Sequence, residues 1–105
     1  DEITKAWSGH TTKQYKKLKD LKKENLRDNM TNLELVLNML AETSTTELSK
    51  KKKPKTLNEN KVIAKKGGAV AGNARKDLEN KLGESVISPL NAKELRKNED
   101  NELNG

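Results

Sequence analysis

Two four-residue segments, Thr31–Glu34 and Thr56–Glu59, have the composition of capping boxes, with which α-helices begin. In each, we expect the threonine hydroxyl to accept a hydrogen bond from the backbone amide three residues on. The glutamate carboxylate accepts one from the threonine amide in return. The sequence therefore predicts an all-α fold, a small helical bundle in which two long helices dominate.

The ends of these helices follow from Pro54 and Gly83. Proline cannot continue a helix without losing a backbone hydrogen bond, and glycine favours the left-handed conformation at a helix C-terminus. We therefore expect two long antiparallel helices, at about 31–51 and 57–82, joined by a basic linker at 50–56.

The first long helix carries the strongest apolar pattern in the chain. Four of its residues fall at helical positions i, i+3, i+4 and i+7, and two more widen the stripe. We expect the helix to be buried on two sides. The stripe consists of Leu33, Val36, Leu37 and Leu40, widened by Leu35 and Met39.

Shorter helices are expected on both sides of this pair. From Tyr15 to Met30, apolar residues recur at spacings of three to five, as one or two short amphipathic helices require. Ser88 and Pro89 suit the N-cap and first position of a last short helix that reaches about Lys97. The apolar residues of the earlier segment are Leu18, Leu21, Leu26 and Met30.

A chain of 105 residues suits a single core. Leu, Ile and Val make up 20% of it, so that core is thin. We expect one helical domain at 13–97, preceded by a lead-in segment at 1–12 whose Trp7 docks on the core. A tail at 98–105, rich in Asn and acidic residues, should be disordered.

Composition argues against several classes of protein. Without cysteine, and with His10 as the only histidine, the chain lacks the usual zinc ligands, so we expect no metal and no cofactor. The absence of an apolar run of about 18 residues indicates a protein with no membrane span, which we expect to be cytoplasmic. The carboxylates at 24, 28, 34 and 42 could in principle pair as catalytic acids do, but carboxylates at helical spacing more often form solvated ion pairs with lysines. We therefore expect neither catalytic residues nor a small-molecule substrate.

The segment 65–76, KKGGAVAGNARK, holds three glycines inside the second predicted helix. It lacks the lysine and hydroxyl residue of a P-loop and the spacing of a dinucleotide fingerprint. Two interpretations remain: a seam of small residues against which a bulky face of the first helix packs, or a hinge. We favour the seam, because the alanines between the glycines are good helix formers. Its residues are Gly67, Gly68, Ala71 and Gly72.

Basic residues form two blocks in a chain of net charge +6. Residues 13–23 hold six lysines and residues 50–66 hold eight. Such blocks either bind nucleic-acid phosphates or act as solvated helix faces. We take as candidate nucleic-acid contacts Lys50, Lys51, Lys52, Lys53, Lys55, Lys65, Lys66, Arg75 and Lys76.

Two stretches carry a resemblance to a known family. The segments LKKENLRDNMTNLELVLNMLAETSTTELSK and KVIAKKGGAVAGNARKDLENKLGESVIS together resemble the C-terminal half of the DNA damage-inducible protein D family, which is related to phage BRO-type antirepressors. The resemblance covers about residues 9–95. It implies a bacterial or prophage cytoplasmic protein of the DNA-damage (SOS) response, with a helical C-terminal region that binds a partner. It identifies no functional residues.

Members of that family usually carry an N-terminal BRO-like domain, implied to contact DNA, which has no counterpart here. The chain opens Asp1-Glu2-Ile3 without an initiator Met, so we expect it to be part of a longer protein. Two functions stay open. One is a non-enzymatic module that contacts DNA without reading its sequence, and the other is a module for self-association or for binding a protein such as a recombination protein.

Overall fold

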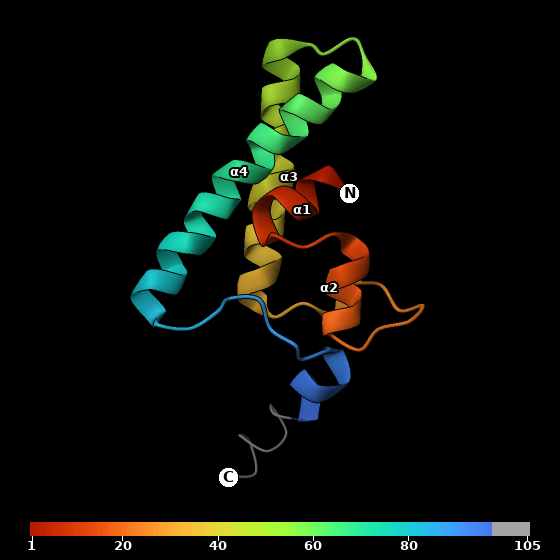
Figure 1. Cartoon of the computed structure of the whole chain (residues 1–105), viewed down its shortest axis with the longest axis vertical. Helices are drawn as coiled ribbons and strands as arrows, with labels where there is room; N and C mark the ends of the chain where they lie inside the picture. The colour runs from red at the N-terminus through yellow and green to blue at the C-terminus, as the bar shows by residue number, and fades with distance from the viewer. Residues whose placement is uncertain (98–105) are drawn as a thin grey trace.

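Helices account for the fold of residues 1–97, the part of the chain that the computed structural model describes (Figure 1). Residues 92–97 are helical, and no β-strand occurs within the described range, so the all-α prediction is confirmed. The tail predicted at 98–105 lies outside it. The other elements are, in order, α1 (Glu2–Ser8), α2 (Thr12–Leu18), the 3-10 turn η1 (Arg27–Asn29), α3 (Asn32–Lys52) and α4 (Leu57–Leu82).

The two long helices begin where their capping boxes predict. The Thr31 hydroxyl accepts from the Glu34 amide at 3.2 Å, and the Thr56 hydroxyl accepts from the Glu59 amide at 3.0 Å. Helix α3 extends to Lys52, so the basic linker predicted at 50–56 begins inside the helix. The pair runs antiparallel from the connecting turn and diverges towards the other end (Figure 1).

The buried face of α3 differs from the predicted stripe. The helix buries Glu34, Leu37, Asn38 and Ala41, whereas Val36 is 61% exposed. Met39 and Leu40 are also exposed, and Leu33 and Leu35 are half-buried. The expectation that this stripe is buried on two sides was therefore wrong, because one face of α3 packs on the rest of the fold and the opposite face meets solvent.

Residues 1–12 are more ordered than a lead-in segment. Asp1 caps α1 by accepting from the amides of Ile3 and Thr4, and Gly9 ends it with φ of 80°. Trp7 docks on the core as expected, with no exposed surface and its ring centroid 6.0 Å from that of Tyr15. The expectation of an irregular segment was wrong because a helix of two turns is too short to show a periodic pattern of apolar residues.

Helix α4 is continuous through its three glycines, and all three are buried. A Cβ at Gly67 would lie 2.6 Å from the Cα of Thr45 in α3. At Gly68 and Gly72 it would meet the carbonyl oxygens of α1, at 3.1 Å and 2.9 Å respectively. The bulky stripe of α3 therefore does not cover the seam. Instead, the glycines let the backbones of α3 and α1 approach α4 closely. Ala71, the fourth residue of the predicted seam, has no exposed surface.

The segments before α3 and after α4 complete the core, and two of their features differ from the prediction. Leu21, Leu26 and Met30 are buried as predicted, but Leu18 is 44% exposed. The last helical segment starts at residue 92 rather than near Ser88. Its first turn is capped by the side chain of Asn91, which accepts from the Glu94 amide at 3.2 Å.

Candidate nucleic-acid interface

The turn between α3 and α4 is fixed by local hydrogen bonds. Lys53 adopts the left-handed conformation, with φ of 50°, and its amide donates to the Ser49 carbonyl at 2.9 Å. The Glu59 carboxylate accepts from the backbone amides of Lys55 and Thr56, at 2.6 Å and 3.3 Å. The turn therefore presents its side chains on an ordered backbone.

We call residues 46–66, which include this turn, the hairpin tip. It carries eight lysines against Glu47 and Glu59, which gives it a formal charge of +6. The other 84 residues hold 14 cationic and 14 acidic side chains, so the tip accounts for the entire net charge of the chain. Figure 1 shows the turn at one extreme of the molecule, at the opposite end of α3 from α2 and residues 92–97.

Four of the predicted lysines surround one hollow of about 530 Å³ on the tip. Its lining also includes Pro54, Val62 and Ile63, and among residues 1–97 the one carboxylate that lines it belongs to Glu59. Because that carboxylate accepts from two backbone amides, it is held at the start of α4 rather than in an ion pair with a lysine. We call this site the tip hollow and its four cations the rim lysines. These are Lys52, Lys53, Lys55 and Lys66.

The remaining predicted lysines do not line the tip hollow. Lys50 forms an exposed ion pair with Glu47, at 3.4 Å, and Lys51 is exposed beside it. Lys65 borders a separate hollow next to α1. Lys76 is exposed farther along α4. Of the predicted contacts, only the four rim lysines therefore line the tip hollow.

Arg75 is a structural residue and not a candidate phosphate ligand. Its side chain is only 15% exposed. The guanidinium donates to the Trp7 carbonyl at 2.8 Å and to the Glu79 carboxylate at 2.7 Å. We therefore correct its assignment to the nucleic-acid contacts, because its hydrogen bonds hold α1 against α4.

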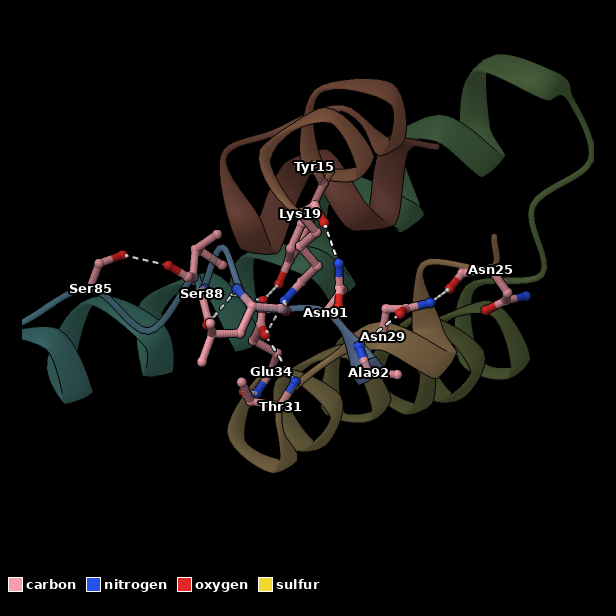
Figure 2. Close-up of polar contacts among 12 residues, drawn as sticks. Tyr15, Lys19, Asn25, Asn29, Thr31, Glu34, Ser85, Ser88, Asn91 and Ala92 are labelled. Carbon is pink, nitrogen blue, oxygen red and sulfur yellow. Dashed lines mark hydrogen bonds and ion pairs between the residues drawn. The ribbon is translucent and has the colours of Figure 1, made fainter. Parts of the chain in front are cut away.

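A second polar cluster lies in the interior and joins three parts of the chain (Figure 2). Lys19 and Glu34 form an ion pair at 2.7 Å, and neither side chain is exposed. The Lys19 ammonium also donates to the Leu90 carbonyl at 2.7 Å, and the Tyr15 hydroxyl donates to Glu34. Burial raises the pKa of the Tyr15 phenol, and its hydrogen bond to Glu34 and the charge of that carboxylate raise it further. Glu34 is therefore not the solvated carboxylate that the sequence suggested.

The Glu34 carboxylate at the centre of this cluster has further donors. Glu34 also accepts from the amides of Thr31 and Ser88, at 2.9 Å and 3.4 Å. Among residues 1–97, no buried side-chain nitrogen or oxygen lacks a hydrogen-bond partner. The cluster thus fastens α2 and the segment after α4 to the start of α3.

The described residues form neither a metal site of acidic, histidine or cysteine side chains nor a membrane-spanning helix. No group of three or more His, Cys, Asp or Glu side chains within 1–97 is arranged to hold a metal ion. Over the same range, no helix combines the length and the apolar character needed to cross a membrane.

Comparisons with known proteins identify no relative. No protein-family model, curated protein or solved structure matches the chain.

Proposed function

We propose that this chain is a non-enzymatic helical module that contacts nucleic-acid phosphates through its hairpin tip. The observation that carries the proposal is the convergence of the four rim lysines on one hollow, in a tip that holds the chain's whole net charge. Lysines that neutralise phosphates release condensed counterions, which drives binding without reading the sequence. The resemblance to the DNA damage-inducible protein D family supports a setting in the bacterial DNA-damage response.

The proposal is tested by titrating labelled DNA with the chain and measuring fluorescence anisotropy at low salt. In the tip variant, Lys52, Lys53, Lys55 and Lys66 are all changed to Gln. In the control variant, the exposed lysines Lys13, Lys17, Lys22 and Lys23 are changed to Gln. Both variants lose four charges, so a difference between them reports position rather than net charge.

We expect the tip variant to bind about tenfold more weakly or worse, and the control variant to retain most of its affinity. Equal losses in the two variants would show that binding follows net charge alone. The proposal would then fail, as it would if the wild-type chain did not bind DNA at low salt.

A second candidate function, self-association or protein binding, is favoured by the outer face of α3. Val36, Met39 and Leu40 are 61%, 47% and 38% exposed there, on the side opposite the buried residues. These three side chains are apolar, and the centre of protein interfaces is more apolar than the rest of the protein surface.

Sedimentation velocity over a range of concentrations tests this candidate. Under it, the wild-type mass rises with concentration, whereas a variant with Val36→Thr, Met39→Gln and Leu40→Gln stays monomeric with unchanged helicity. A partner other than a second copy would leave the wild type monomeric as well. Adding a candidate protein to the same experiment then shows whether a heavier species forms and whether the variant abolishes it.

A further inference from the structure

Aromatic side chains are absent from the hairpin tip, where nucleic acid is proposed to bind. Trp7 and Tyr15 have no exposed surface, and the His10 ring packs edge-on against Tyr15 at 6.1 Å between centroids. Proteins that bind single strands without sequence preference stack successive bases on aromatic rings. The tip has no such platform, so its affinity has to come from phosphates.

The rim lysines extend from the turn along α4 over a length at which a duplex presents twice as many phosphates as a single strand. Lys52, Lys53 and Lys55 flank the turn, and Lys66 lies nine residues beyond Leu57 in α4. At about 1.5 Å per residue, this places Lys66 roughly 14 Å along the helix. Over such a length duplex DNA presents roughly eight charges, and one of its strands presents half as many.

The charged groups of the tip also bear on sequence preference. All its cations are lysines, which act as point charges, and none is an arginine, whose planar fork reads guanine edges. Contacts of this kind position a protein on the phosphate backbone and carry no base information.

From these observations we infer that the tip hollow takes the phosphate backbone of double-stranded nucleic acid in preference to single strands, with one phosphate for each rim lysine. This inference rests on the proposed function and specifies its ligand. It also fixes the salt dependence, because each neutralised phosphate of a duplex contributes about −0.9 to the slope of log affinity against log salt.

The test compares a duplex with one of its separated strands, each about 20 nucleotides long, from about 50 to 200 mM NaCl. We expect the wild-type chain to bind the duplex about tenfold more tightly, with a slope of about −3.6. Changing any one rim lysine to Gln should make that slope shallower by about 0.9. Lys13→Gln, which removes an exposed lysine of α2 at the opposite end of α3, should leave it unchanged.

The other outcomes separate the inference from the proposed function. If the single strand binds equally well or better and still requires the rim lysines, the inference is overturned and the proposed function stands. Binding of neither DNA overturns both. Equally tight binding of polyglutamate with the same charge as the duplex would also overturn both, because the tip would then recognise an acidic protein as readily as DNA.

Discussion

At the scale of single residues, the least predictable feature is the burial of Lys19 and Glu34. Glu34 was recognisable as a capping-box residue, and it does cap α3. Nothing local in the sequence shows that the same carboxylate pairs with a lysine 15 residues earlier, at 2.7 Å and out of contact with solvent. The pairing depends on the path of the chain between α2 and α3, which local propensity does not fix.

Replacing Glu34 by Ala should destabilise the fold by about 3–5 kcal/mol, because it leaves the Lys19 ammonium buried without its counter-charge. Urea unfolding followed by circular dichroism measures the loss. The matched control is Glu47→Ala, which removes an ion pair whose side chains are 70% and 67% exposed and should change stability by at most about 1 kcal/mol. A similar small loss for both variants would contradict the account of a tightly paired interior.

Glu79 should make stability depend on acidity. Burial raises the pKa of its carboxyl, but hydrogen bonds from the Val86 amide, Arg75 and Ser85 together bring the pKa below its ordinary value of 4.5. The folded state therefore binds this proton less readily than the unfolded state. The resulting stabilisation is present above about pH 4.5 and is lost as the pH falls through the folded pKa.

We therefore expect Glu79→Gln to be less stable than the wild type at neutral pH, by about 1–2 kcal/mol, with a gap that narrows in acid. Urea unfolding at neutral and acidic pH measures the gap. Glu84→Gln, at an exposed position nearby, is the control for the loss of one negative charge. A gap for Glu79→Gln that is the same at both pH values would contradict the assigned role.

At the scale of elements, helix ends were predictable and helix faces were not. The capping boxes act over four residues, so the starts of α3 and α4 could be derived from sequence alone. The face that α3 buries depends on contacts with distant segments. The Trp7 indole donates to the buried Asn38 at 3.1 Å, and Ala41 packs in the same core. The buried face of α3 is therefore centred on a polar residue and a small one, and not on Val36 and Leu40.

Substitution of Gly67 by Ala should reverse the usual effect of that change in a helix. Alanine at an exposed helical site is more stable than glycine by about 0.5–1 kcal/mol. At position 67 the new methyl group would lie 2.6 Å from the Thr45 backbone, so we expect a net loss of about 1–3 kcal/mol in urea unfolding. Ala69→Gly, at an exposed position, calibrates helix propensity and should cost about 1 kcal/mol. A more stable Gly67→Ala variant would show that α3 and α4 are not in close contact.

At the scale of the whole molecule, charge and packing are separated. The core cluster gathers α1, α2, the first half of α3, Ala71 of α4 and the segment after α4, whereas the net charge lies at the hairpin tip. The sequence showed the basic block, because consecutive lysines are visible in one dimension. That four of its lysines line one hollow depends on the closing of the hairpin. The exclusion of Arg75 from the candidate site depends on α1, because the Trp7 carbonyl accepts a hydrogen bond from Arg75.

The position of Trp7 has a practical consequence. It is the only tryptophan, it lies on α1, and its indole is fully enclosed and bonded to Asn38. Its ultraviolet emission therefore reports whether the N-terminal helix is docked, independently of the overall helix content. A red shift that precedes the loss of helicity would identify release of α1 as a separate step in unfolding. The hairpin tip contributes no emission of its own, so events there alter this signal only if they move α1.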